Sequence, residues 1–166
     1  MNVIKAERDV FSKMVRGDRV CYFPVDDKHI FVTPDGYMGY IFPISTVSFN
    51  VSKCMKMEPL KFEEIIKPEN ELRLTFDFRQ GGFGDKRMYR RLKGPGNSVF
   101  VNNAFLANFQ NPRFWQDKEN PYSLITVTEK GAAAHQDIPV GIVLPIKTYC
   151  ADWGKDDYWK EGETCG

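Results

Sequence analysis

The spacing of apolar positions predicts an amphipathic helix near the start of the chain. From residue 3 to residue 16 the apolar side chains recur at the separations that bring them to one face of a helix. They are Val3, Ile4, Val10, Phe11, Met14 and Val15. Gly17 follows, and glycine often ends helices because it accepts the left-handed backbone conformation. We therefore expect a helix over residues 3–16.

Residues 19–49 predict three strands. Three apolar runs rich in aromatic and β-branched side chains are separated here by two polar segments. We expect the first turn over residues 25–28. The second covers Pro34, Asp35 and Gly36, a sequence that strongly favours a turn because proline and glycine supply the backbone angles.

Residues 71–79, ELRLTFDFR, alternate between polar and apolar side chains at every position. Leu72, Leu74, Phe76 and Phe78 consequently share one face of an expected strand, and the polar side chains between them share the other. Residues 86–93, KRMYRRLK, are expected to form its antiparallel hairpin partner. The glycine-rich stretch between the two segments would connect them.

The remaining pattern is weaker. Residues 98–102, 123–128 and 141–149 read as strands, and residues 62–70 as one helical turn stopped by Pro68. Asn102 or Asn103 is expected to cap a second helix, NAFLANF, which ends near Pro112. The sequence thus predicts a single α+β domain over residues 1–150, mostly antiparallel sheet with two short helices. Residues 151–166 form an acidic, aromatic C-terminal tail.

Two parts of the chain resemble each other. VTPDG at residues 32–36 parallels VTEKG at residues 127–131, and GYIFPI at residues 39–44 parallels GIVLPI at residues 141–146. An expected helix precedes each pair. Either the domain consists of two pseudo-repeated helix–strand–strand halves that share one sheet, or two β-hairpins have similar turns by chance.

The arrangement resembles a single domain of the DNA sliding clamps, which is built from two β-α-β-β-β units. The segments that carry the resemblance are FVTPDGY, SVFVNNAFLANF and VGIVLPIKT, together 28 of the 166 residues. Clamp subunits contain two or three such domains, whereas this chain has room for one. The resemblance implies a clamp-like fold and a role near nucleic-acid machinery.

Charge is distributed unevenly in this chain of 166 residues, whose net charge is +1. Residues 79–93 carry a net charge of +5, and residues 149–166 a net charge of −3. The first residues are too polar for a signal peptide, and no apolar run approaches the length of about 18–20 residues that crosses a membrane. We therefore expect a cytoplasmic protein with no membrane partner.

Residues 79–96, RQGGFGDKRMYRRLKGPG, are the most distinctive segment. In a strand, Arg87, Tyr89, Arg91 and Lys93 would project from one face, with side chains about 6.7 Å apart along it. Such a face could follow a nucleic-acid backbone and stack a base on the tyrosine. Two alternatives stay open: a charged edge strand protected from aggregation, or a docking surface for an acidic protein. The candidate binding residues are Arg79, Lys86, Arg87, Tyr89, Arg90, Arg91 and Lys93.

No enzyme, metal or cofactor signature is present. The glycine-rich stretch matches no phosphate-binding loop, His29 and His135 have no partner at metal-ligand spacing, and the four cysteines lack metal-like spacing. Trp153 and Trp159 of the tail are candidate contacts to a partner. We therefore predict a non-enzymatic protein that binds nucleic acid or a nucleoprotein complex.

Two other functions stay open from the sequence. One is a small phage-type inhibitor, similar to anti-CRISPR proteins, that binds a host nucleic-acid enzyme. The other is an enzyme whose catalytic residues come together only in the fold. The oligomeric state is not predicted.

Overall fold

The computed structural model describes residues 1–25, 27–33, 38–56, 70–80, 87–95, 98–117, 120, 122–131 and 136–146, with only the backbone at residues 56, 77, 79 and 80. Of the predicted turn at residues 25–28 all but residue 26 is therefore described, whereas the predicted turn at residues 34–36 lies outside the described residues. The helical turn predicted within residues 62–70, the glycine-rich hairpin tip, and the tail with Trp153 and Trp159 lie outside these ranges.

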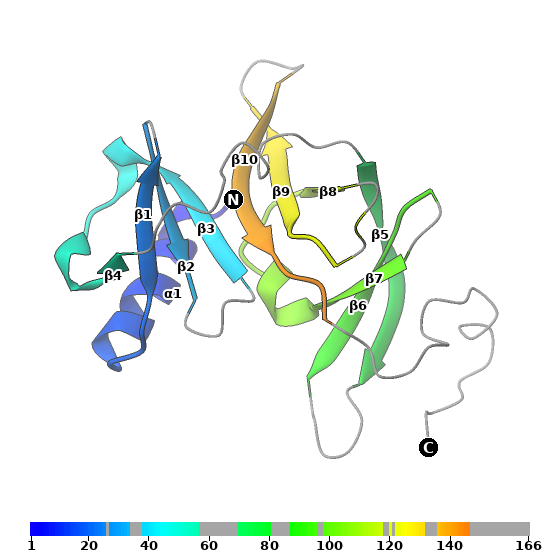
Figure 1. The fold of residues 1–166 in the computed structure, drawn as a ribbon, viewed down its shortest axis with the longest axis horizontal. Helices are drawn as coiled ribbons and strands as arrows, with labels where there is room; N and C mark the ends of the chain where they lie inside the picture. Colours follow the sequence, from blue (N-terminus) through cyan, green and yellow to red (C-terminus); the bar gives the residue numbers. More distant parts are fainter. Residues whose placement is uncertain are drawn as a thin grey trace.

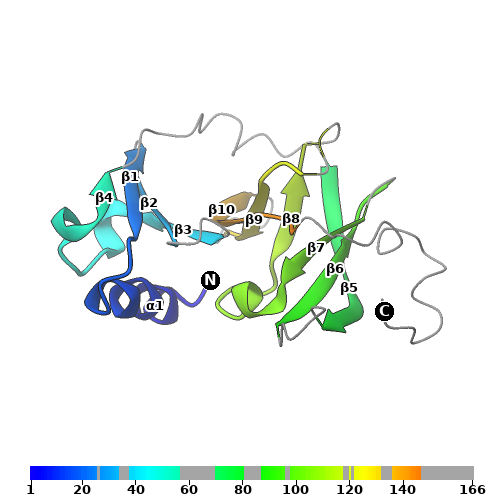
Figure 2. The same ribbon diagram turned by 60° about the horizontal axis from the view of Figure 1, so that its bottom comes forward.

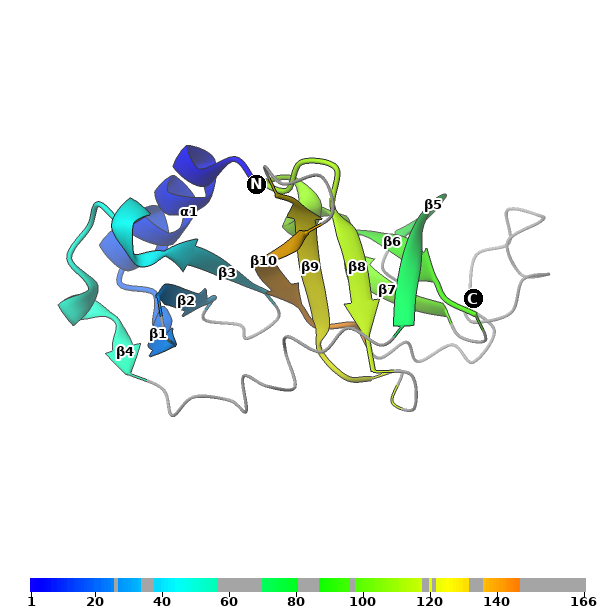
Figure 3. The same ribbon diagram turned by 90° about the horizontal axis from the view of Figure 1, so that it is seen from above.

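In the described part of the chain, ten strands form one sheet, with the order β4-β1-β2-β3-β10-β9-β8-β5-β6-β7 (Figures 1 and 3). Their bounds are β1 Cys21–Val25, β2 Lys28–Val32, β3 Met38–Pro43, β4 Met55–Lys56, β5 Asn70–Gln80, β6 Met88–Lys93, β7 Ser98–Asn102, β8 Arg113–Gln116, β9 Ile125–Lys130 and β10 Asp137–Val143. Only the short β1–β4 pairing is parallel among these. The predicted α+β class with a mostly antiparallel sheet is confirmed.

The helix α1, Val3–Val15, packs against one face of β1–β3 (Figure 2). Asn2 caps it, since its side-chain oxygen accepts a hydrogen bond from the backbone N–H of Lys5 at 3.1 Å. Gly17, with φ +82°, follows the last turn as the sequence predicts. None of the described helices is long and apolar enough to cross a membrane.

The second predicted helix is wrong as an α-helix. Residues Asn103–Leu106 form a short 3₁₀ helix, η3, capped by the predicted Asn102. Pro112 and the positive φ of Asn111 leave too few residues for several α-helical turns. The backbone bonds here join residues three apart, from Ala107 N–H to the Ala104 carbonyl at 3.4 Å and from Phe109 N–H to the Leu106 carbonyl at 3.2 Å, which is the 3₁₀ pattern. Two further 3₁₀ segments, η1 Ile44–Thr46 and η2 Val51–Lys53, follow β3.

The two similar sequence segments meet at the centre of the sheet. β3 and β10 are antiparallel neighbours, with Gly39 opposite Ile142 and Tyr40 opposite Gly141. β2 and β1 continue the sheet beyond β3, as β9 and β8 continue it beyond β10. The segment after β10 then returns to β7, where the Ile146 N–H donates to the Phe100 carbonyl at 2.8 Å. The second half of the sheet is therefore strongly curled (Figure 1).

The main core lies between α1, β1–β3 and the inner side of the curled strands. It includes Val10, Phe31, Phe42, Leu92 and Phe114, all at most 1% exposed. A second apolar cluster on the opposite face of β1–β3 contains Phe23, Ile30, Val32, Ile41 and Ile142. Because both faces of these strands are buried, their sequences are nearly continuous apolar runs instead of alternating ones.

A partly buried pair of polar side chains links β1 and β2. Tyr22 Oη and His29 Nδ1 are 2.7 Å apart. Burial lowers the pKa of His29 below its usual value of 6.5 and raises the pKa of Tyr22, with Cys54 adding to the latter shift. The fold therefore favours neutral histidine.

We expect this histidine to make the free energy of unfolding depend on pH. The unfolded chain protonates His29 more readily than the folded chain, so its contribution is complete above pH 6.5 and is lost as the pH falls toward the folded-state pKa. Urea unfolding at pH 7.5 and pH 5.5 measures it, with His29→Asn as the non-titrating control. The stability of the wild type should fall more than that of the variant, and equal losses would contradict this assignment.

Candidate nucleic-acid interface

The predicted hairpin forms, but it is not at the edge of the sheet. β6 pairs with β5 on one side and with β7 on the other. Its backbone hydrogen-bonding groups are therefore used on both sides. The interpretation of its charges as protection of an exposed edge strand is wrong for residues 88–93, since protection is needed only where one side is unpaired.

The face expected to bind nucleic acid is largely buried. Tyr89 is 5% exposed and Arg91 is 3% exposed, whereas Arg87 and Lys93 at the two ends are exposed. Nε and Nη2 of Arg91 donate to Ser98 Oγ at 3.1 and 2.8 Å. The alternation was predicted correctly, but burial of Tyr89 and Arg91 removes them from the accessible surface.

β5 contains a bulge that changes how its apolar residues are covered. Leu74 lies opposite Leu92 and Phe78 lies opposite Arg90, so residues 75–77 of β5 face the single residue Arg91 of β6. Thr75 stabilises this irregular segment, because its hydroxyl donates to the Arg91 carbonyl at 3.1 Å and its carbonyl accepts from Arg90 Nε at 2.8 Å.

Beyond the bulge the apolar side chains leave the core. Leu72 is 2% exposed, but Phe76 is 89% exposed and Phe78 is 41% exposed. Met88, two positions from Arg90 on the same face of β6, is 43% exposed. We call Phe76, Phe78, Met88 and Arg90 the aromatic–arginine face. Phe76 and Phe78 are therefore exposed, although the alternation groups them with the buried Leu72.

Arg90 lies between the two phenylalanine rings. Its guanidinium carbon is 4.9 Å from the centre of the Phe78 ring and 5.8 Å from that of Phe76. Among the residues that the structure describes, no carboxylate pairs with Arg90. Its charge is therefore available to an anionic ligand beside two exposed rings.

Arg113 provides a contrast on β8. It also lies over an aromatic ring, 4.7 Å from the centre of Trp115, but its Nε donates to Glu71 at 2.8 Å and its Nη1 to Asp137 at 2.5 Å. These bonds raise the pKa of Arg113, and the bond from Arg113 is the main cause of the lowered pKa of Glu71. The charge of Arg113 is thus neutralised by Glu71 and Asp137, and the side chain links β8 to β5 and β10.

The other predicted site residues are placed only in part. The backbone of Arg79 is in β5 opposite Tyr89, but its side chain lies outside the described atoms, as do Lys86, Trp153 and Trp159 entirely. Arg87 lies over the Tyr89 ring, 5.8 Å from its centre. In the described part of the chain, no group of three His, Cys, Asp or Glu side chains is arranged to hold a metal ion.

Comparison with known proteins adds no assignment. No family model, curated protein or solved structure matches this chain. The interpretation of the aromatic–arginine face therefore rests on its own geometry.

Proposed function

We propose that this protein binds single-stranded nucleic acid through the aromatic–arginine face and catalyses no reaction. The observation that carries the proposal is the exposure of two neighbouring phenylalanine rings, Phe76 and Phe78, around the cation of Arg90, which has no carboxylate partner among the described residues. Large apolar side chains that are grouped on a surface usually mark an interaction site. Here an arginine lies among them.

The rings suit unpaired bases. Flat aromatic side chains on a sheet are common platforms for the bases of single strands, and stacking contributes about 1–3 kcal/mol per base. Phe76 and Phe78 are two positions apart, so each ring can take a different base of an extended strand. The bases of a duplex are already stacked, which is why we expect a preference for single strands.

Cations around the rings suit the phosphates of the same strand. Arg90 lies on the face itself, and Arg87 and Lys93 are exposed near the two ends of β6. Phosphate contacts orient the strand without reading its sequence, whereas the rings tolerate any base. The combination predicts binding with little sequence specificity.

The test is fluorescence anisotropy with labelled single-stranded and double-stranded DNA and RNA across a salt series. Three to five phosphate contacts on a single strand predict that the logarithm of the association constant falls with log salt at a slope of about −2 to −3.5. Absence of binding to single strands at low salt would contradict the proposal.

The inhibitor hypothesis predicts a different outcome of the same experiment. Exposed phenylalanine, methionine and arginine side chains are also common at protein interfaces. An inhibitor of a nuclease or polymerase should bind the purified enzyme tightly and free nucleic acid weakly. The resemblance to a clamp domain stays a prediction as well: light scattering should reveal a closed oligomer if it holds and a monomer if it does not.

A further inference from the structure

The outer face of α1 carries a row of exposed apolar side chains far from β5 and β6 in sequence. Ile4 is 78% exposed, Phe11 is 50% exposed and Val15 is 69% exposed. Their separations of seven and four residues place them on one side of the helix, away from the buried Ala6 and Val10. No cap, turn or core contact of α1 requires these residues to be apolar.

This row borders a hollow in the surface. A depression of about 380 Å³ lies between α1 and the segment after β3, lined by Ile4, Glu7, Arg8, Phe11, Ser48 and Phe49. The Phe11 and Phe49 rings lie 6.4 Å apart there. Glu7 holds that segment against the helix, since its carboxylate accepts from the Ser48 N–H at 2.9 Å. The concave, largely apolar floor suits an inserted side chain better than a flat membrane surface.

The charges around the hollow favour an acidic ligand. Lys5 and Arg8 are exposed and, within the part of the chain that the structure describes, neither forms an ion pair. Lys5 and Arg8 also border a second, shallower depression of about 320 Å³ beside Asp9.

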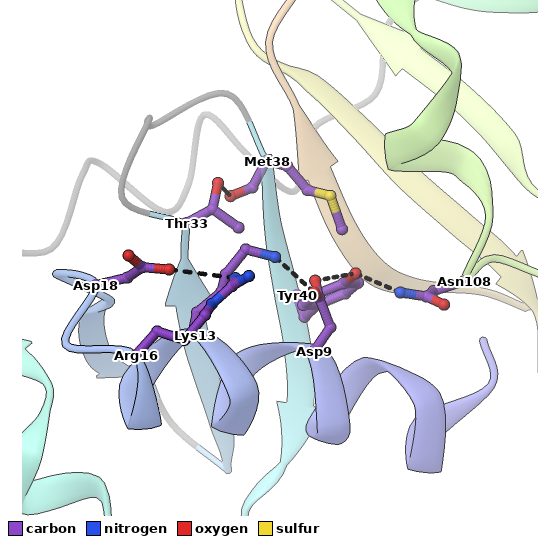
Figure 4. Close-up of polar contacts among 8 residues, drawn as sticks. All are labelled: Asp9, Lys13, Arg16, Asp18, Thr33, Met38, Tyr40 and Asn108. Atoms are coloured by element: carbon purple, nitrogen blue, oxygen red, sulfur yellow. Dashed lines mark hydrogen bonds and ion pairs between the residues drawn. The ribbon is translucent and has the colours of Figure 1, made fainter.

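The acidic side chains of the helix are already engaged. Asp9 binds Lys13 Nζ at 2.5 Å and accepts from the Tyr40 hydroxyl at 3.0 Å, and that hydroxyl in turn accepts from Asn108 at 2.6 Å (Figure 4). Glu7 is bound to Ser48. The cations are therefore the charged groups most available to a ligand along this face.

We infer that the outer face of α1 is a docking site for an acidic amphipathic segment of a partner protein. Apolar side chains of the partner fill the hollow between Phe11 and Phe49, and flanking Asp or Glu side chains pair with Lys5 and Arg8. Unlike the rings of the aromatic–arginine face, Phe11 lies beside Phe49 in a hollow that Ile4 also lines, and this concave shape suits an inserted side chain better than a flat base. This inference is independent of the function proposed for the aromatic–arginine face.

The probe is a fluorescent 15-residue synthetic helix with leucines on one face and glutamates beside them, titrated with the full chain. A second peptide has lysine in place of every glutamate, and vesicles with phosphatidylserine represent a membrane. We expect binding of the glutamate peptide only. Phe11→Ala should weaken it by about 30-fold, the effect of losing a central interface residue. Arg8→Glu should weaken it in a salt-dependent manner.

Phe76→Ala is the matched control, because it removes an exposed ring from the other face. It should leave binding of the glutamate peptide unchanged. Circular dichroism of each variant verifies that the fold is retained, and the exposed positions of Phe11 and Arg8 make misfolding an unexpected outcome. Equal binding of both peptides, binding of vesicles instead of the glutamate peptide, or no effect of Phe11→Ala would each overturn the inference.

Discussion

Replacing Phe76 and Phe78 together with alanine should nearly abolish binding to single-stranded nucleic acid while leaving the fold intact. Each stacked base contributes about 1–3 kcal/mol, so each lost ring should lower the affinity by about 5-fold to 150-fold. Phe76 is 89% exposed, so its removal opens no cavity in the core. Anisotropy with a labelled oligonucleotide measures the affinity, and thermal unfolding verifies stability.

The comparison with other variants makes this result specific. Phe76→Trp retains a stacking surface and should retain binding. Phe11→Ala removes a comparably exposed ring from α1 and should not affect nucleic acid. Arg90→Gln retains a polar side chain without the charge and should reduce the salt dependence as well as the affinity. Unchanged affinity of the double alanine variant would exclude these rings as the binding surface.

The largest effect on stability should come from Gly141→Ala. A Cβ atom at this position of β10 would lie 2.4 Å from Cζ of Phe109, a ring that is 7% exposed, and 3.0 Å from the Gly39 carbonyl oxygen. Overpacking of this kind costs about 1–3 kcal/mol of the free energy of unfolding. For a domain of this size we expect the melting temperature to fall by about 2–4 °C for each kcal/mol.

Two further variants test the cause of this effect. At Gly131 a Cβ would meet the end of the Ile138 side chain, at 2.7 Å from Cδ1. That side chain is 40% exposed and can rotate away, so Gly131→Ala should cost little. Adding Phe109→Leu to Gly141→Ala should recover part of the lost stability. If Gly131→Ala and Gly141→Ala were equally destabilising, the Phe109 contact would not be the cause.

Local sequence signals predicted most of the elements. The helix, its end before Gly17, the Asn102 cap and the pairing of residues 71–80 with 88–93 all follow from periodicity and turn residues. The strands β4 and β8 were missed because they have only two and four residues. A pattern so short cannot be distinguished from a loop, and pairing with longer neighbours determines such strands.

In the candidate site, too, the sequence determined the local pattern and the tertiary structure determined the rest. Period-two alternation determined which side chains of β5 and β6 share a face, because it is a property of each strand alone. It could not determine which face is buried, because the elements that pack against a face come from elsewhere in the chain. The sequence therefore grouped Phe76 and Phe78 on one face of β5 and proposed Tyr89 and Arg91 as accessible binding residues.

Only the tertiary structure decided that Phe76 and Phe78 are exposed and that Tyr89 and Arg91 are buried. β5 is eleven residues long, whereas its partners β8 and β6 have four and six residues. The far end of β5 therefore extends beyond β8, which pairs only with its first residues. The bulge before Phe78 adds residues to β5 without adding partner residues on β6. The sequence by itself determined the elements and which side chains share a face. The curl of the sheet and the relative lengths of its strands decided which aromatic rings are exposed to solvent.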